Sequence, residues 1–257
     1  MTRLVSFATL ALALSASAAF AAEPKPTVVL VHGAFAESAS WDGVIADLVR
    51  DGYPVLAAAN PLRGAAGDAA YLASVVRSVT GPVILVGHSY GGTVISQAAV
   101  GAPRVKALVY VAAFAPDIGE NSEELAVKFP GSTLLASLGP PMRLPSGSDE
   151  FYIRQDRFPL QFAADLPLAR ARLLAAAQRP ATTEAFEEKA TGAAWKTIPS
   201  WWIYGSADRN IPAAALAFMA QRAQARKVVV VPSASHVVMV SHPHDVSALI
   251  EIAAKAQ

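Results

Sequence analysis

Six short runs of β-branched and aliphatic residues recur along the chain without polar alternation. They occupy residues 27–31, 54–58, 82–86, 105–111, 200–204 and 227–231. Such runs are typical of strands that are buried on both faces, as in a parallel sheet. Helical segments are predicted between them, at residues 38–51, 67–79, 89–100, 213–223 and 244–254. Strands alternating with helices predict right-handed crossovers and a mostly parallel, doubly wound α/β sheet of about six strands.

The interval between residues 111 and 200 breaks this alternation. It contains no convincing buried strand, only segments with Pro, Gly and charged residues and helical stretches such as 166–178. So long an interval is not a simple crossover loop in a compact domain. We therefore predict a mostly helical lid at residues 119–197, inserted into a core formed by residues 22–118 and 198–257.

The first 21 residues are predicted to be a secretory signal peptide. Arg3 precedes the apolar run LVSFATLALALSASAAF, and the small-x-small sequence at 19–21 marks a cleavage point. A retained membrane anchor is the alternative, but the run is rich in Ala and Ser, which favours cleavage. We expect an exported protein, periplasmic or secreted, with no membrane segment after cleavage.

The composition argues against several kinds of site. The chain has no cysteine, which excludes thiolate nucleophiles, thiolate metal sites and iron–sulfur clusters. Its 21 basic and 20 acidic side chains nearly balance, and no basic block suggests nucleic-acid binding. His242 and His244 are spaced like a metal-binding pair, but no third ligand follows in a suitable context. We expect no metal, no organic cofactor and no nucleic-acid partner.

The strongest chemical signal is the sequence VGHSYGG at residues 86–92, which ends one aliphatic run and precedes a helical stretch. A nucleophile on a sharp strand-to-helix turn has a strained backbone, and small residues two positions away prevent collisions. Such a turn exposes Ser89 at the carboxyl end of the strand. A glycine-rich turn that merely contains a serine is the alternative. The flanking strand and helix favour Ser89 as a nucleophile.

A serine hydroxyl needs a base, and the base needs a carboxylate to orient it. Among the five histidines, His236 lies in a loop just after the sixth aliphatic run, and we predict it as the base. Two carboxylates follow strand ends: Asp208 in YGSADRNIP after the fifth run, and Asp117 after the fourth. We favour Asp208, which also gives the chain order Ser, Asp, His expected for such a turn.

The loop after the first aliphatic run completes the predicted site. Its sequence is HGAF at residues 32–35, in which Gly33 allows a close backbone approach. Main-chain N–H groups in this loop and at the start of the helix after Ser89 can stabilise the negative charge of a tetrahedral intermediate. We predict an oxyanion hole formed by Ala34 and Tyr90. An ordinary tight turn is the alternative for this loop.

Together, the HGAF, GHSYG, DRNIP and SHVVMVSHP segments resemble the α/β-hydrolase superfamily, apart from the lid. The chain is most similar to a small cofactor-free branch with plant methyl-ester esterases, hydroxynitrile lyases and bacterial pyrethroid-hydrolase-like esterases. The resemblance implies a six-stranded parallel core. We expect no antiparallel first hairpin of the kind that larger members have, since the predicted mature chain begins so close to Thr27. Lyases of this pattern carry Thr after the first His and Lys after the catalytic His. Here Gly33 and Val237 stand at those positions, which favours an esterase.

The expected reaction is hydrolysis of a small-molecule ester through an acyl-enzyme. Because the lid is rich in apolar side chains, a small to medium apolar ester is favoured over a charged or peptide substrate. The side chains expected at the pocket are Phe35, Phe151, Phe158, Phe162, Trp195 and Met239. A cofactor-free lyase or dioxygenase, or a weakly catalytic ligand-binding protein, is the alternative on the same fold.

Overall fold

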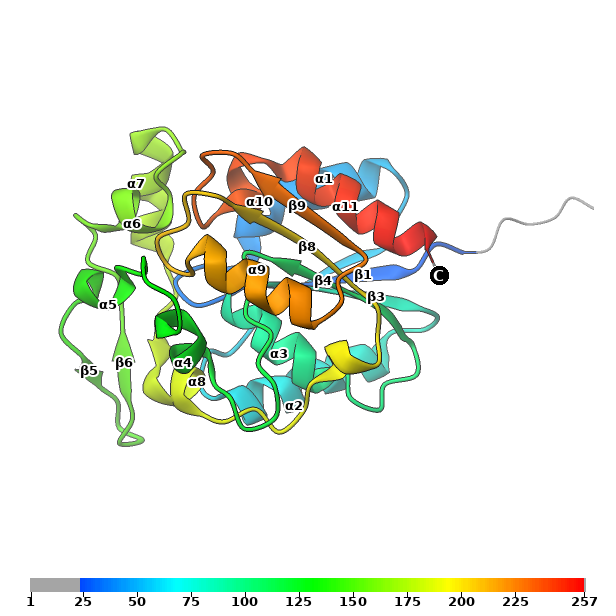
Figure 1. Cartoon of the computed structure of the whole chain (residues 1–257), viewed down its shortest axis with the longest axis horizontal. Coiled ribbons are helices and arrows are strands. Elements are labelled where there is room, and N and C mark those ends of the chain that lie inside the picture. The colour runs from blue at the N-terminus through cyan, green and yellow to red at the C-terminus, as the bar shows by residue number, and fades with distance from the viewer. Residues whose placement is uncertain (1–23, 257) are drawn as a thin grey trace, which may run out of the picture.

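A six-stranded parallel sheet forms the centre of the structure (Figure 1). The computed structural model describes residues 24–256, so the predicted signal peptide at 1–21 lies outside the described residues. The strands are β1 (Thr27–Val31), β2 (Val55–Ala58), β3 (Val83–His88), β4 (Val105–Val111), β8 (Ser200–Gly205) and β9 (Lys227–Val231). Their order is β2-β1-β3-β4-β8-β9, and every neighbouring pair is parallel. The predicted α/β-hydrolase sheet is confirmed.

Helices cover both faces of this sheet. They are η1 (Ser38–Trp41), α1 (Asp42–Arg50), α2 (Ala65–Ser78), α3 (Tyr90–Ala98), α9 (Ala213–Arg222), α10 (Val238–Ser241) and α11 (Pro243–Lys255). In Figure 1, α1 and α11 lie above the sheet, and α2 and α3 lie below it. Each helix predicted for the core is found among these elements, and the one predicted at residues 38–51 is divided into η1 and α1. None of the helices within residues 24–256 has the length and apolar character needed to span a bilayer.

Strand β9 differs from the expectation for residues 227–231. Its unbroken valines predicted burial on both faces, but within residues 24–256 β9 is the last strand of the sheet and pairs only with β8. Val228 and Val230 are therefore 43% and 46% exposed. A run of β-branched residues indicates a strand, whereas exposure depends on the place of that strand in the sheet, which the sequence does not reveal.

The lid lies between the end of β4 and the start of β8, and its elements from α4 to α8 form the green to yellow-green region at the left of Figure 1. Its helices are α4 (Ser122–Val127), α5 (Leu134–Ser137), α6 (Phe158–Phe162), α7 (Leu168–Ala177), α8 (Thr183–Glu187) and η2 (Ala194–Lys196). It also contains an antiparallel sheet of β5 (Met142–Arg143), β6 (Asp149–Phe151) and β7 (Ala181–Thr182). The prediction of a mostly helical lid missed these strands because each is very short and contains no aliphatic run.

Direct contacts hold the lid on loops at the carboxyl end of the sheet. The Phe35 N–H, just after β1, donates a hydrogen bond of 2.9 Å to the main-chain oxygen of Arg179 in the lid. Arg63, which precedes α2, forms an ion pair of 2.9 Å with the buried carboxylate of Glu150 in β6. The lid and the sheet therefore enclose the space above the strand ends together.

Candidate active site

Ser89 lies at the turn between β3 and α3 with a strained backbone. Its φ is 52° and its ψ is −124°, a conformation that residues with a Cβ atom rarely adopt. A Cβ atom on Gly87 would lie 2.6 Å from the main-chain oxygen of Gly91, so the turn needs a glycine there. The strained turn places Ser89 directly beyond the carboxyl end of β3, as expected for a nucleophile on such an elbow.

His236 and Asp208 meet in the loops after β9 and β8. The Nδ1 atom of His236 lies 2.6 Å from Oδ2 of Asp208, and both side chains are buried. The other carboxylate oxygen accepts the N–H groups of Asn210 at 2.8 Å and Ile211 at 3.0 Å. These main-chain donors fix the carboxylate, and because a carboxylate has no proton to donate, His236 Nδ1 carries the ring proton and donates it to Asp208. Nε2 is left as the basic nitrogen.

Ser89 and His236 both line one cavity. No hydrogen bond joins Ser89 Oγ to the His236 ring in the described part of the chain. Contacts of this kind are often long before substrate binds and tighten in the complex. The structure thus brings the predicted nucleophile and base to the same space, with the base already oriented by Asp208.

The other candidate acid and the other histidines of the C-terminal segment lie elsewhere. Asp117 pairs with Lys196 at the base of the lid. His242 contacts Ser241, and His244 donates to the buried carboxylate of Asp47 on α1. Within residues 24–256, no group of three His, Cys, Asp or Glu side chains is arranged to hold a metal ion.

The predicted oxyanion donors have free N–H groups. Neither the Ala34 nor the Tyr90 N–H donates a hydrogen bond within the described residues. Tyr90 is the first residue of α3, where N–H groups lack helical partners and the helix dipole favours negative charge. A Cβ atom on Gly33 would lie 2.6 Å from Cβ of Ser89, so only glycine lets this loop approach Ser89 so closely. Both donors can therefore face an oxyanion that forms at Ser89.

Hydrogen bonds of the His32 ring support the loop that contains Ala34. The Asn60 N–H donates to His32 Nε2 at 3.1 Å, so the ring proton is on Nδ1, which donates to the oxygen of Gly33 at 2.9 Å. Burial lowers the pKa of His32 to about 4, which keeps the ring neutral. The ring thus fixes the backbone next to the Ala34 donor without adding charge to the site.

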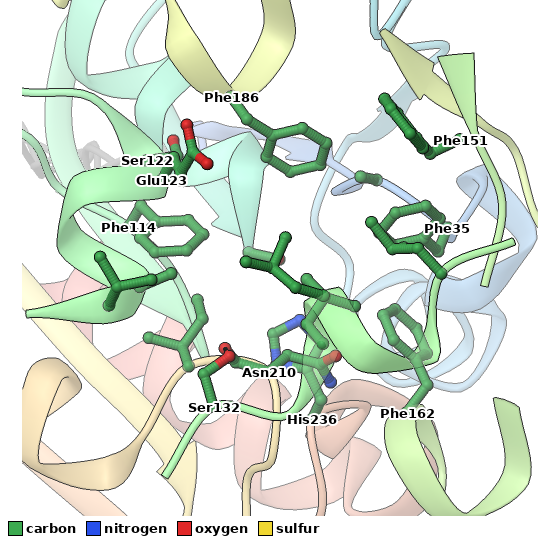
Figure 2. Close-up of a pocket in the computed structure, with 18 of the residues that line it drawn as sticks. Phe35, Phe114, Ser122, Glu123, Ser132, Phe151, Phe162, Phe186, Asn210 and His236 are labelled. Atoms are coloured by element: carbon green, nitrogen blue, oxygen red, sulfur yellow. Dashed lines mark hydrogen bonds between the residues drawn. The ribbon is translucent and has the colours of Figure 1, made fainter. Parts of the chain in front are cut away.

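A cavity of about 460 Å³ lies between the lid and the carboxyl end of the sheet. Five phenylalanines supply much of its wall, from both the core and the lid (Figure 2). They are Phe35, Phe114, Phe151, Phe162 and Phe186. The polar groups of His236, Asn210 and Ser132 lie together at the lower side of this view. The cavity therefore presents a small reactive region within a mostly apolar wall, which is the usual character of a small-molecule site.

The charges at the cavity wall are few. Its ionisable lining residues are Glu123, Glu187 and His236, with no lysine or arginine among the described lining residues. A substrate that carries a carboxylate would therefore lack a cationic partner there.

Known proteins support the fold and place the chain in a family. A model of the alpha/beta hydrolase family matches residues 28–249. The chain belongs to the alpha/beta hydrolase family. This confirms the resemblance that was predicted from the sequence motifs.

The individual relatives match only part of this chain or share low sequence identity with it. A carbendazim hydrolyzing esterase from Nocardioides sp. (strain SG-4G) is 36% identical over 116 residues, which cover 39% of this chain and 47% of that protein. The structure of polyneuridine aldehyde esterase superposes with a TM-score of 0.77 at 20% identity, over 89% of this chain and 98% of the other. A pyrethroid hydrolase from Sphingobium faniae JZ-2 gives a TM-score of 0.70 at 24% identity, over 90% and 98%. At such identities the structures establish the fold alone.

The structure brings three of the six predicted pocket residues to the cavity and leaves three outside it. Phe35, Phe151 and Phe162 line the cavity. Phe158 is fully buried behind Phe162, with ring centroids 4.8 Å apart. It therefore packs the lid rather than lining the cavity.

The other two predicted residues lie in the protein interior. Trp195 is buried, and its indole N–H donates to the oxygen of Pro116 at 3.0 Å. Met239 is fully buried in α10. Large apolar side chains of a lid or a core loop pack against one another as often as they face a ligand, and the sequence does not separate the two cases.

Two phenylalanines of the cavity were not predicted. Phe114 follows β4, at the same edge of the sheet as Ser89, and its position after a predicted strand could have identified it. Phe186 lies in α8, where its ring stacks on Phe35 at 6.2 Å between centroids. No sequence signal places α8 over the cavity, because that contact depends on how the lid folds.

Proposed function

We propose that this chain is a serine carboxylic-ester hydrolase that acts on small to medium apolar esters through an acyl-enzyme. The observation that carries the proposal is the 2.6 Å contact between His236 Nδ1 and Asp208, with His236 on the wall of the cavity that Ser89 also lines. The N–H groups of Ala34 and Tyr90, which have no acceptor among the described residues, support acyl transfer in particular, because that chemistry develops negative charge on a carbonyl oxygen.

In the first half of the reaction, Ser89 Oγ attacks the ester carbonyl while His236 Nε2 takes its proton. Asp208 stabilises the imidazolium that forms, and the Ala34 and Tyr90 amides stabilise the oxyanion. The tetrahedral intermediate then collapses. The alkoxide leaves with the proton held by His236, and the acyl group stays on Ser89.

In the second half, water enters the cavity and attacks the acyl-enzyme carbonyl. His236 accepts the water proton, and the same two amides stabilise the second oxyanion. Collapse of this intermediate breaks the bond to Ser89 and returns the proton to Oγ. The acid is released, and no net change remains on the enzyme.

The cavity supports a neutral, apolar substrate. Its volume of about 460 Å³ suits a small to medium molecule, and its wall is mainly phenylalanine and aliphatic side chains. The acidic Glu123 and Glu187 disfavour an ester that also carries a carboxylate. The relatives named as esterases and a hydrolase agree with this class of reaction.

We also propose that residues 1–21 direct export and are removed, which leaves a periplasmic or secreted enzyme. The mass of the protein recovered from periplasm and medium tests this, since cleavage removes the segment that ends at Ala21. Full-length protein in the membrane fraction would contradict it.

Hydrolysis of p-nitrophenyl esters of increasing acyl length by the mature protein tests the function, with Ser89→Ala as the matched variant. We expect turnover with an optimum at short to medium chains, and its loss in Ser89→Ala. Folded protein without turnover on any ester would overturn the proposal. It would favour a cofactor-free lyase, a dioxygenase or a ligand-binding protein instead.

A further inference from the structure

Gln161, in the lid helix α6, has a partner for every hydrogen-bonding position of its side chain. Its Nε2 donates to the main-chain oxygen of Arg209 at 2.9 Å and to Oδ1 of Asn210 at 3.1 Å. Its Oε1 accepts the hydroxyls of Thr133 at 2.8 Å and Ser137 at 2.9 Å. The side chain is only 5% exposed. A buried amide with two donors and two acceptor sites filled holds one orientation, because rotation would leave buried groups unpaired.

Asn210, in the core loop after β8, also donates a hydrogen bond to Gln161. Its Nδ2 donates to the main-chain oxygen of Gln161 at 3.2 Å, so the two residues are joined in both directions. Its own N–H donates to Oδ1 of Asp208 at 2.8 Å. Ser132 of the lid also donates to the main-chain oxygen of Asn210 at 2.9 Å. A continuous series of hydrogen bonds therefore runs from the lid to the carboxylate that orients His236.

The same residues reach the substrate cavity. Asn210 lines the cavity directly. Leu134 and Leu138 also line it, and each directly follows in sequence a residue whose hydroxyl donates to Gln161. Phe162, the neighbour of Gln161 in α6, is another part of the wall. Movement of this part of the lid would thus disturb the support of the catalytic carboxylate.

We propose that Gln161 is a positioning residue for catalysis, and that its reciprocal pair with Asn210 couples the closed lid to the orientation of Asp208. We call this pair the lid clamp. Its role in turnover rests on the proposed ester hydrolysis. When the clamp is closed, the Asn210 N–H aligns Asp208, which then holds His236 as a base in the correct tautomer. When the clamp is open, the cavity wall loses its support from Gln161, and the carboxylate of Asp208 keeps only the Ile211 N–H in a fixed position.

Gln178 provides a matched control, because it is a buried lid glutamine whose hydrogen bonds only stabilise the lid. It is 7% exposed and lies at the end of α7. Its Oε1 accepts the N–H of Ile153 at 2.9 Å, and its Nε2 donates to the oxygens of Ile153 and Ala175 at 2.8 and 2.9 Å. All of these partners belong to the lid, and none touches the loop that carries Asp208.

The test compares Gln161→Met with Gln178→Met, since methionine keeps the length of glutamine and removes its hydrogen bonds. We expect both variants to lower the thermal midpoint of unfolding. Only Gln161→Met should lower kcat, on the order of ten- to a hundredfold, because a small displacement of the carboxylate misaligns the base. Only this variant should also move the low-pH limb of the kcat/KM profile to lower pH, since a misaligned carboxylate stabilises the imidazolium less. Equal kcat values and equal profiles for the two variants would overturn the clamp.

A second variant and a second measurement keep the test decisive. If Gln161→Met does not fold, Gln161→Glu removes the two donors to the Asp208 loop but keeps both hydroxyl contacts, and it should lose kcat similarly. Activity at the wild-type level in Gln161→Glu would overturn the proposal.

The far-downfield proton resonance of His236 Nδ1–H reports the Asp208 contact without turnover. It should shift or broaden in Gln161→Met and stay unchanged in Gln178→Met. An unchanged resonance in both variants would overturn the clamp even if no ester is hydrolysed, whereas a wild-type protein without turnover would overturn only the proposed function.

Discussion

The Nε2 atom of His88 lies 3.1 Å from the main-chain oxygen of His236, and the two imidazole rings are 4.7 Å apart between centroids. Since a carbonyl oxygen only accepts, Nε2 carries the ring proton and donates it. The other ring nitrogen, Nδ1, has no partner within residues 24–256. Burial, and then the neighbouring His236, hold the pKa of His88 well below its ordinary value, so the ring stays neutral. His88 thus supports the backbone of the proposed base without adding a charge beside it.

This contact predicts a difference between two substitutions of His88. His88→Leu leaves the buried oxygen of His236 without a donor, which costs about 1–3 kcal/mol and loosens the loop of the base. His88→Gln can keep an N–H near the position of Nε2. We expect kcat for ester hydrolysis to fall by up to about a hundredfold in His88→Leu and much less in His88→Gln. Steady-state kinetics on both variants, with urea unfolding as the measure of stability, check this. Equal kcat values would contradict it.

The buried His32 predicts a loss of stability in mild acid. Its pKa is lowered by burial to about 4 in the folded chain, against an ordinary value of 6.5. Between these values the unfolded chain binds a proton that the folded chain does not. The contribution of the neutral His32 to stability is therefore fully present above pH 6.5, and it is lost as the pH falls toward 4. The contribution of this residue over that interval is about 3 kcal/mol.

The variant His32→Gln isolates this effect, because the Gln amide oxygen can accept the Asn60 N–H but does not titrate. The free energy of unfolding in urea, measured at neutral pH and near pH 5, should depend less steeply on pH in the variant than in the wild type. Some dependence should remain, since His88 has a lowered pKa of the same sign. Identical slopes for the two proteins would contradict the lowered pKa of His32 in the folded state.

Substitutions of Phe186 and Phe158 distinguish a residue of the cavity wall from a residue that only packs the lid. Phe186→Ala removes a ring that lines the cavity, so the preferred ester of the p-nitrophenyl series should become longer. Phe158→Ala removes a fully buried ring outside the cavity lining, which should cost about 3–5 kcal/mol of stability without shifting the preferred chain length. Kinetics across the ester series and thermal melting of both variants test this. A shift in Phe158→Ala alone would contradict the assignment of the cavity wall.

The features that the sequence predicts best depend on local order along the chain. Ser89, Asp208 and His236 each follow an aliphatic run, and parallel strands bring their carboxyl ends to one edge. The exposure of Val228 and the place of Phe186 depend instead on which elements become neighbours. The lid clamp could not be predicted for the same reason. Gln161 and Asn210 are 49 residues apart, and nothing in either segment indicates that the lid folds back onto the loop of the acid.

Gly33 tests the oxyanion hole without a change to any polar side chain. A Cβ atom there would lie 2.6 Å from Cβ of Ser89 and 2.8 Å from the oxygen of His88, so Gly33→Ala must push its loop away from Ser89, the proposed nucleophile. The Ala34 N–H moves with that loop, and losing one oxyanion donor lowers kcat by about a hundred- to a thousandfold. Gly67→Ala is the matched control, because a Cβ atom at that position in α2 meets nothing within 4 Å. It should keep wild-type kcat and gain slightly in stability. Hydrolysis of p-nitrophenyl esters by the two variants decides the matter, since comparable kcat values would exclude this loop from oxyanion stabilisation.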